Sequence, residues 1–460
     1  MQPHSRPAGP DWAKNLPEAF LSFQGGRRIE EVECIIPDIV GMSRGKAMPA
    51  GKFAPQQTTF LPVSLFYQTV SGAYVEMDIE NQWMESDVVL RADMATACAV
   101  PWAEDLTLQV IHDLETRDGA PLPIAPRNVL KRVLGLYASR GWRAVVAPEL
   151  EFYLTKPNVD PNEPIEPPLA RTGRRGAGRQ AYSMVAVDDY GSVIDTIYDF
   201  AEAQGLAIDT VIQEGGAGQI EINLQHGDPL TLADQVFYFK RTIREAAMKN
   251  RIFATFMAKP MRDEPGSAMH IHQSVLDAAT GENIFSLPDG APSAAFHHFI
   301  GGSQRHLKSV MPLLAPYVNS YRRFTAGMSA PVNLEWGADN RTTGLRIPNA
   351  GASGRRVENR VIGIDTNPYL AIAASLACGY LGMVNGVEPT PAATGEVYQE
   401  RSALPSGLAG SLAGFAADQD VRDVLGEEFC QLFEAIKHAE LDEFQREISP
   451  WEREHLLLNV

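Results

Sequence analysis

The chain has 460 residues, of which 45% are hydrophobic and 21% charged, a composition typical of a globular protein with a large core, and this excludes wholesale disorder. Its 57 acidic and 40 basic side chains give a net charge of −17, which argues against a nucleic-acid partner and suits a cationic substrate, although solubility alone explains many acidic surfaces. The four cysteines lie far apart without a CxxC pair, which disfavours a disulfide scaffold or zinc finger and favours a cytoplasmic location.

Residues 1–16 are polar and proline-rich and lack the apolar core of a signal peptide, so we expect a flexible tail there. Gly and Pro turns separate three short predicted strands, at residues 27–36, 73–79 and 85–91. The sequence DGAPLPIAP (118–126) has the composition of a linker. It predicts a boundary between a small β-rich N-terminal domain, residues 17–120, and a large α+β domain, residues 121–460.

The larger domain begins with a predicted helix at residues 126–141, which has Pro near its start and Gly141 as its stop. Residues 229–251 predict a second helix, followed by a strand at 252–258, and residues 427–448 predict a helix near the C-terminus.

Two further segments need interpretation. Residues 156–179 are dense in Pro and Gly and predict a long excursion loop, which is a solvated flap, an oligomer contact or an active-site lid. The run from Pro368 to Val387 carries no charge and is long enough to cross a membrane. Because it is rich in Ala, Gly and Ser, we expect a helix buried on all sides in a large core, and no membrane partner.

Four strand-like segments carry polar residues in alternation with apolar ones. Alternation alone also marks any half-exposed strand. Residues two apart in a strand share a face. The segments place these polar side chains on faces with apolar backs: Glu149 and Glu151; Glu221 and Asn223, with Glu214 in the glycine-rich turn before them; His270 and His272; Arg356, Glu358 and Arg360.

If these faces converge, the carboxylates outnumber the arginines and repel one another, and each uncompensated buried charge costs several kcal/mol. Divalent cations remove that cost. Ligands rich in oxygen, with at most two imidazoles, favour Mg²⁺ or Mn²⁺ over zinc.

Competing motifs are missing from the sequence. The run GMSRGKA (41–47) has the wrong spacing for a phosphate-binding P-loop, and no HExxH pattern occurs. The glycines of GRRGAGR (173–179) do not follow a convincing strand, so a dinucleotide site is disfavoured, and nothing argues for a Ser-His-Asp triad.

Several blocks match one known family in order and spacing: ESDVVLRAD (85–93), PELEFYL (148–154), EGGAGQIEINL (214–224), FATFMAKPM (253–261), GSAMHIHQS (266–274), NRTTGLRIP (340–348), RRVENR (355–360) and NPYLA (367–371). On these blocks the chain resembles the glutamine synthetase family over nearly its full length. The resemblance implies an α+β fold, with a small β-grasp-like N-terminal domain and a catalytic domain built on a curved antiparallel sheet flanked by helices. It also implies a homo-oligomer, commonly a dodecamer of two stacked hexameric rings, with each active site between adjacent subunits.

The resemblance also implies site residues by position. One metal ion would be held by Glu151, Glu214 and Glu221. A second would be held by Glu149, His270 and Glu358. ATP would contact His272, Ser274, Arg346 and Arg356. Glutamate would be seated by Gly266, Arg323 and Arg360. The residues implied to act in catalysis are Arg341, which would face the transferring phosphoryl group, Arg360 and Glu214.

The chemistry implied is a carbon–nitrogen ligation. ATP would phosphorylate the γ-carboxyl of glutamate to a mixed anhydride, which an amine then attacks. Two cations and the arginines would stabilise the charge on the phosphates, and the site must exclude water to protect the acyl phosphate.

The chain departs from the family at the ammonia site, which needs two acids. Residues 51–66 contain no acid where one would be contributed across the subunit interface, and Ser329 stands where the second would lie. A larger amine is therefore predicted, with apolar walls such as Phe60, Leu61, Phe66 and Met328. This arrangement resembles the γ-glutamylpolyamine synthetase branch, which uses putrescine or similar amines.

Other interpretations remain open at this point. The chain could be an ordinary glutamine synthetase with replacement acids, a ligase for ethanolamine or for an alkyl or aromatic amine, or a non-catalytic ring scaffold. Freeing the lone pair of a primary amine at pH 7 costs about 4 kcal/mol, and the base is not evident, although Glu214 is the nearest candidate by family geometry. Tyr398 lies near a regulatory tyrosine of some family members, but its flanking residues differ, so we interpret it as an ordinary surface tyrosine.

Overall fold

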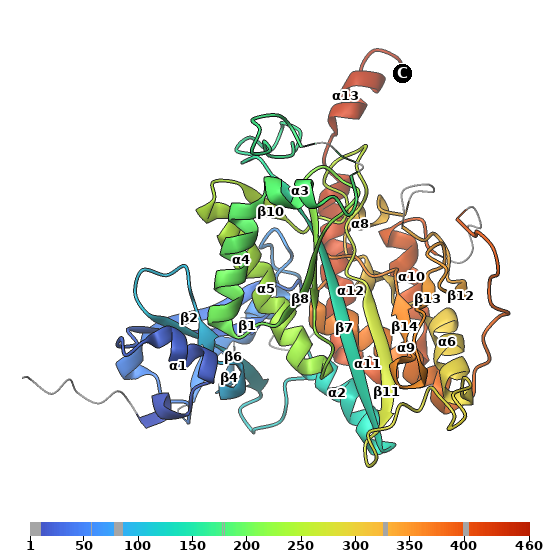
Figure 1. Cartoon of the computed structure of the whole chain (residues 1–460), viewed down its shortest axis with the longest axis horizontal. Helices are drawn as coiled ribbons and strands as arrows, with labels where there is room; N and C mark the ends of the chain where they lie inside the picture. The colour runs from blue at the N-terminus through green and yellow to red at the C-terminus, as the bar shows by residue number, and fades with distance from the viewer. Residues whose placement is uncertain are drawn as a thin grey trace, which may run out of the picture.

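The computed structural model describes residues 11–56, 58–77, 86–176, 178, 180–324, 330–398 and 404–460. The described part contains two sheets with helices packed around them (Figure 1). Most of the predicted N-terminal tail, like residues 78–79, 85 and 325–329, lies outside the described residues.

The first sheet has the order β2-β1-β6-β4-β3, with β5 paired to β6. Its strands β1 and β6 are parallel and the other pairs antiparallel. The strand bounds are β1 Glu31–Pro37, β2 Ser43–Pro49, β3 Thr59–Pro62, β4 Asp87–Ala92, β5 Cys98–Ala99 and β6 Thr107–Glu115. A short helix, α1 (Glu18–Gln24), lies beside β5 at this end of the molecule (Figure 1).

Two of the three strands predicted here are present, as β1 and β4, but the strand predicted at 73–79 is wrong in its described part. Residues 69–75 close a tight loop instead, in which Thr69 N donates to Ala73 O over 2.8 Å and Val75 N donates to Tyr67 O over 2.8 Å. The turn at Gly72, with φ +87°, folds the segment back on itself, so its backbone groups are satisfied locally rather than in the sheet.

The second sheet has the order β12-β13-β14-β11-β7-β9-β8, with β10 paired to the end of β7. Apart from the parallel pair β12–β13, its pairs are antiparallel. The strand bounds are β7 Trp142–Thr155, β8 Ile208–Gln213, β9 Gln219–Leu224, β10 Phe253–Thr255, β11 Ile271–Asp277, β12 Trp336–Ala338, β13 Leu345–Ile347 and β14 Val357–Asn359. The long strand β7 runs through the centre (Figure 1) and pairs with three others, so it is the element on which the sheet is aligned.

Helices α2 (Pro126–Ser139) and α5 (Pro229–Lys249) pack against β7, and α9 (Pro368–Asn385) packs against both of them. Both α2 and α5 begin with proline at the first helical position, and the Asp228 side chain caps α5 by accepting from Thr231 N. The remaining α-helices are α3 Met184–Asp189, α4 Gly191–Gln204, α6 Ala294–His306, α7 Met311–Leu314, α8 Val318–Tyr321, α10 Leu408–Ala417, α11 Gln419–Leu425, α12 Glu427–Gln445 and α13 Pro450–Leu456. The helices predicted at 126–141, 229–251 and 427–448 correspond to α2, α5 and α12, so their existence is confirmed.

Helix α9 corresponds to the uncharged run from Pro368 to Val387, which we expected to lie in the core. Within the described part of the chain it is the one helix long and apolar enough to cross a membrane, and 83% of it is buried inside the protein. It packs against α2, α5, α6, α7 and α11, which confirms the expectation of a helix buried on all sides.

One large core joins the two sheets. Leu114 of β6 and Phe66, in the short 3-10 helix that follows β3, belong to the same buried cluster as Val129 of α2 and Phe152 of β7. The boundary predicted at residues 120/121 falls in the connection between β6 and α2, and the division into two domains remains a prediction.

The buried Arg127 side chain of α2 links the first sheet to helix α5. Its guanidinium donates to Asp93 (2.7 Å) and Asp113 beside the N-terminal sheet, and makes two bonds of 3.0 and 2.8 Å to Asp234 of α5. Tyr369 of α9 also donates to Asp234. One arginine therefore neutralises carboxylates from both halves of the molecule.

Replacing Arg127 with Met should lower the free energy of unfolding by about 3–5 kcal/mol, because Asp234 would be left buried without its cation. Thermal and urea unfolding would measure the loss. The matched control is Arg117→Met, which removes an exposed pair with Asp87 and should cost less than about 1 kcal/mol. Equal losses in the two variants would contradict a linking role for Arg127.

Candidate active site

The antiparallel register of β7 and β9 brings the first group of predicted acids together. Glu151 lies opposite Glu221, and Glu149 lies opposite Asn223. Since side chains alternate between the faces of a strand, these four share one face. The opposite face, which includes Leu150, is buried against the helices, so the sheet has one polar face and one core face here.

The strands β11 and β14 add the second group. His272 lies opposite Glu358, and Glu358 lies opposite Arg346 of β13. His270 precedes β11 by one residue, and its backbone oxygen still accepts from Glu149 N over 2.9 Å. The predicted alternation is therefore correct, but the regular strands are shorter than the sequence pattern indicated.

These faces line a cavity of about 430 Å³, which we call the acidic cavity. The predicted residues in its wall are Glu149, Glu151, Glu214, Glu221, Gly266, His270, Arg323, Arg341, Arg346, Glu358 and Arg360. His272, Ser274 and Arg356 line an adjoining cavity of about 500 Å³ that shares Glu149 and Asn223 with the first. The structure thus brings every residue predicted to bind metal, ATP or glutamate, or to act in catalysis, to one of two neighbouring cavities.

The acids of the acidic cavity resist ionising together. Burial, followed by the charge of Glu214, raises the pKa of Glu151 to about 8. Burial, followed by the charges of Glu149 and Glu151, raises the pKa of Glu221 to about 9. Burial also raises the pKa of Glu214. At neutral pH Glu151 and Glu221 therefore hold protons unless a cation is present.

Two other acids stay ionised because cations or imidazoles contact them. Burial opposes ionisation of Glu149, but hydrogen bonds with His270 (3.0 Å) and His272 (2.8 Å) outweigh it and hold the pKa of Glu149 well below its usual range. Burial likewise opposes ionisation of Glu358, whose pKa is nevertheless lowered by the nearby His270 and Arg360. Glu358 accepts from Arg360 over 2.7 Å and from Arg346 over 2.8 Å.

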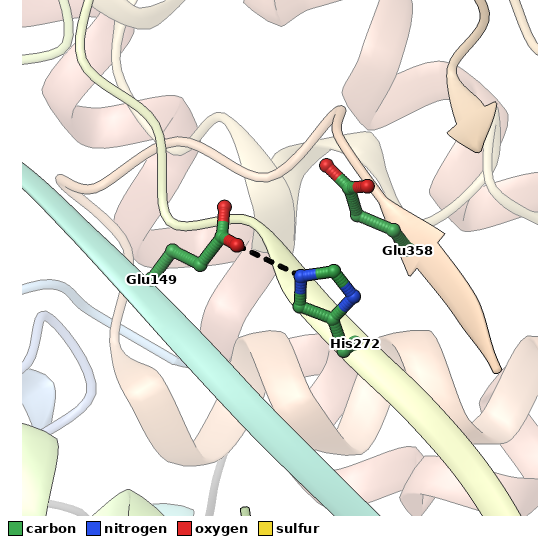
Figure 2. A group of neighbouring side chains, drawn as sticks. All are labelled: Glu149, His272 and Glu358. Atoms are coloured by element: carbon green, nitrogen blue, oxygen red, sulfur yellow. Dashed lines mark hydrogen bonds and ion pairs between the residues drawn. The ribbon is translucent and has the colours of Figure 1, made fainter. Parts of the chain in front are cut away.

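A metal ion fits this donor set. Glu149, His272 and Glu358 each offer one ligand atom, and these atoms lie within 4.8 Å of one another. The three side chains point toward one another from β7, β11 and β14 (Figure 2). Asn223 Oδ1, in the same wall, is buried and has no hydrogen-bond partner among the described residues. Clustered carboxylates and an unpaired amide oxygen are the groups that Mg²⁺ or Mn²⁺ would take as ligands.

The geometry favours His272 beside Glu149 and Glu358, whereas the resemblance assigned that position to His270. His270 Nδ1 also lies close, at 3.8 Å from Glu151 and 3.9 Å from Glu358. Both imidazoles therefore reach the acids, and either could ligate a cation.

Gln219 fixes the glycine-rich loop that carries Glu214. Its side-chain oxygen accepts from Gly216 N (3.0 Å) and its amide donates to Gly266 O (3.0 Å). A side chain at Gly216 would meet Tyr153 at 2.0 Å, so the loop requires glycine there. Gln219, which is 1% exposed, thus joins the loop of Glu214 to the segment of Gly266.

Arg323 and Gly266 form one end of the acidic cavity. Arg323 is 2% exposed and donates to the backbone oxygens of Val361 and Arg360 over 2.8 and 2.6 Å. Burial lowers the pKa of Arg323 to about 10, so it remains a cation at neutral pH. A Cβ at Gly266 would lie 2.5 Å from Arg323 Cγ, which explains glycine at that position. Arg341, in the same wall, is exposed and free to approach a ligand.

Several residues in the walls were not found from the sequence. Tyr182 lines the acidic cavity and has φ +65°, a conformation rare for a tyrosine, stabilised by its N–H donating to Gln213 O. Tyr398 is half-buried in the same wall, which corrects its interpretation as a surface residue. Asp209 lies at a register shift between β8 and β9 and lines the adjoining cavity. Such a bulge places a side chain off the regular alternation, so a period-two pattern cannot reveal it.

Comparison with known proteins assigns the chain to a family. The glutamine synthetase catalytic domain matches residues 123–456. The chain belongs to the glutamine synthetase family. A gamma-glutamylputrescine synthetase of Escherichia coli (strain K12) is 36% identical over 437 residues, covering 93% of this chain and 92% of that protein. A glutamate–isopropylamine ligase of a Pseudomonas species is 33% identical, covering 90% of this chain and 92% of that one.

Other glutamine synthetase relatives give the same answer. A glutamine synthetase of Pyrococcus abyssi (strain GE5 / Orsay) is 32% identical and covers 88% of each chain. The solved structure of a protein called GmaS in complex with ADP has a TM-score of 0.79 and 26% identity, and covers 95% of this chain and 99% of that one. The predicted family and its α+β fold are confirmed, and the predicted enzyme class, a carbon–nitrogen ligase, agrees with the names of these relatives.

Binding of Mg²⁺ at pH 7 should release protons, because a cation needs the ionised forms of Glu151 and Glu221, whose pKa values of about 8 and 9 keep them protonated. Affinity for Mg²⁺ should rise with pH until about pH 9 and then level off. Calorimetry in two buffers of different ionisation enthalpy would count the protons. Glu221→Gln should release fewer protons than the natural protein, and a buffer-independent heat would contradict the shifted pKa values.

Substituting Gln219 with Leu should weaken Mg²⁺ binding by about 10–100-fold, because the loop of Glu214 would lose its attachment to Gly266. Calorimetry would measure the affinity, and circular dichroism would check that the fold is retained. Gln235→Leu on α5, which lines neither cavity, serves as the control. Unchanged affinity in a folded Gln219→Leu protein would show that the loop is held by other contacts.

Proposed function

We propose that this chain ligates the γ-carboxyl of L-glutamate to an amine, with ATP as co-substrate, and that the preferred amine is a polyamine such as putrescine. The observation that carries the proposal is the acidic cavity, in which the buried Glu151 and Glu221 lie with the half-buried Glu214 beside arginines. Such a cluster is costly without cations and suited to hold them against phosphates. The names of two relatives, for putrescine and isopropylamine, support an amine larger than ammonia.

The proposed ion sites follow the acids. One Mg²⁺ or Mn²⁺ would be held by Glu151, Glu214 and Glu221. The other would be held by Glu149, Glu358 and one of the two histidines. Bound divalent cations would supply neutralisation of the phosphate charge. The oxygen-rich set of proposed ligands supports Mg²⁺ or Mn²⁺ as the metal.

The nucleotide would lie in the adjoining cavity, whose wall contains the predicted His272, Ser274 and Arg356. The complex of GmaS with ADP supports a nucleotide site in this fold. Arg346 was predicted to contact ATP, but it lines the acidic cavity and bonds Glu358 and Asp339. We therefore propose that Arg346 orients Glu358 and reaches only the phosphate end of ATP.

Glutamate would be seated at Gly266, Arg323 and Arg360. An oxygen of its γ-carboxylate would attack the γ-phosphorus of ATP, forming γ-glutamyl phosphate and releasing ADP. Arg341 and Arg360 would stabilise the charge that develops on the transferring group. The amine nitrogen would then attack the acyl carbon, and phosphate would leave with the electrons of the broken C–O bond.

The amine must lose a proton in that step. Glu214 is the proposed acceptor because it lies in the loop at the cavity wall and burial raises its pKa, which makes it a stronger base than an exposed carboxylate. Its position beside Glu221 means that proton transfer and cation binding compete for the same carboxylate.

The amine pocket is the part of the site that departs most from the family pattern. Phe66 was predicted to line it, which is wrong, because Phe66 is fully buried in the core. Phe60 is 43% exposed and Leu61 is partly buried, and neither lines the acidic cavity of its own chain. They could reach only a neighbouring subunit, as the predicted ring would require. Met328 and Ser329 lie outside the described residues.

The proposed setting is a cytoplasmic homo-oligomer, a dodecamer of two hexameric rings, that acts on small molecules and has no nucleic-acid or membrane partner. The acidic composition supports the exclusion of nucleic acid.

Phosphate release should require glutamate and an amine together, and putrescine should give a higher kcat/KM than ethanolamine, isopropylamine, an aromatic amine or ammonium. A coupled ATP assay with this panel would measure it. Ser329→Glu should raise ammonium use and lower putrescine use, whereas Ser329→Gln, equal in size but uncharged, should not raise ammonium use. Strong ammonium turnover without response to diamines would indicate an ordinary glutamine synthetase, and a lack of metal-dependent ATP binding would indicate a scaffold.

A further inference from the structure

A separate cavity of about 600 Å³ lies where the loop between β1 and β2 approaches α5 and β10. We call it the basic cleft and define it by residues 40–43, Lys240, Arg241, Arg244, residues 254–257 and Asp365. It shares no lining residue with the acidic cavity or the adjoining cavity. Its volume is within the range of small-molecule sites, about 300–1,000 Å³.

Three cations face this cleft from consecutive turns of α5, against one carboxylate. Arg241 is already neutralised, because it is paired with both oxygens of Glu33 and contacts Gln109. Arg244 is different. Among the described residues it has no hydrogen bond and no ion pair, and its guanidinium carbon lies 4.8 Å from the centre of the Phe256 ring. A guanidinium that contacts a ring but makes no ion pair has N–H groups available for an oxyanion.

Lys240 provides a second cation at the base of the cleft. It is 9% exposed and donates to the backbone oxygens of Ile364 and Thr366, which flank Asp365. Burial, followed by the charge of Arg244, lowers the pKa of Lys240 to about 7. A second positive group beside a buried lysine is unfavourable in an empty pocket and favourable where an anion binds.

The base of the cleft is connected to the glutamate end of the acidic cavity. One oxygen of Asp365 accepts from Ser320 Oγ over 2.6 Å, and Ser320 O accepts from Arg323 N over 3.2 Å. The charges of Lys240 and Arg323 both act on Asp365. A short run of packed groups therefore leads from Lys240 to Arg323, the arginine in the wall of the acidic cavity.

We propose that the basic cleft binds a small anionic metabolite, by a carboxylate or phosphate group on Arg244 and Lys240, and that its binding weakens the affinity for glutamate. An anion would draw the Lys240 ammonium away from the backbone oxygens on either side of Asp365. The support that Asp365 gives to Ser320 and Arg323 would loosen as a result. The site is distinct from the reaction centre, so its binding can be tested whether or not the proposed ligation is correct.

The binding test is calorimetry on the full chain with malonate and with inorganic phosphate as the probes. We expect saturable binding of at least one probe, about tenfold weaker in Arg244→Met, because a charge-assisted bond is lost. Arg251→Met, which removes an exposed arginine just after α5, and Arg341→Met in the acidic cavity should each stay within about twofold. The preferred probe distinguishes a carboxylate ligand from a phosphate ligand.

Three results would overturn the binding site. The first is an absence of saturable heat from either probe up to about 10 mM. The second is unchanged binding in Arg244→Met. The third is a change of oligomer size in Arg244→Met, which would place Arg244 in a subunit contact instead.

The coupling is tested by the KM for glutamate with and without malonate. We expect malonate to raise the KM about fivefold or more in the natural protein and to have no effect in Arg244→Met. Competition at the acidic cavity would instead persist in Arg244→Met, and that result would overturn the coupling while leaving the calorimetric binding site intact.

Discussion

The mutual repulsion of buried carboxylates is the constraint on which the rest of this site depends. Glu151 and Glu221 face each other across two paired strands, and Glu149 lies two residues away on the same face. Such a cluster has only a few ways to be stable: protonation, hydrogen bonds from imidazoles, ion pairs with arginines, or bound cations. In the structure, protonation, hydrogen bonds from imidazoles and ion pairs with arginines each stabilise a different acid. A bound metal ion would neutralise the acids that these contacts leave charged. The raised and lowered pKa values are therefore two consequences of one arrangement.

The scaffold keeps these acids together against their repulsion. The apolar back of β7 packs on α2 and α5, and α9 packs against both helices, so the sheet cannot relax without opening the core. Gln219 joins the loop of Glu214 to the segment of Gly266, and Arg127 links the first sheet to helix α5. Rigid support of this kind is what a site needs when its geometry must be held within a fraction of an ångström.

Local features of this molecule could be predicted from the sequence, and features that depend on strand pairing could not. The polar face of Glu149 and Glu151 follows from a period of two, and α2 follows from its proline and its apolar pattern. The register that sets His272 beside Glu358 depends on the pairing of two segments that are distant in the sequence. Periodicity cannot predict such a pairing, and only the resemblance to a family indicated that the two segments meet. The positive φ of Tyr182 and the bulge at Asp209 leave no mark in a pattern of residue types.

The predictions that were wrong share a cause. Phe66 was placed at the amine because apolar residues suit methylenes, but an apolar residue next to a strand is as suited to a core. In the described part of the strand predicted at 73–79, Gly72 closes a turn whose hydrogen bonds compete with pairing in the sheet. In both cases composition described the residues correctly but did not decide between two compatible environments. Contacts with distant residues of the core decided for Phe66, and hydrogen bonds within the turn decided for the loop.

Charge on the whole molecule bears on the choice of amine. The two acids that the resemblance places at the family's ammonia site are missing from the sequence, so a cationic amine would meet neither of those carboxylates beside the acyl group. The bound cations would also neutralise the acids that remain in the cavity. Attraction for a dication would then come from the net charge of −17, which acts at long range and weakens with salt. Selectivity would rest on the fit of the methylenes and would depend little on salt. In an amine site of this kind, long-range charge would attract the amine and the fit of its methylenes would select among amines. A diamine could then bind with one ammonium group in solvent while the other is deprotonated for attack.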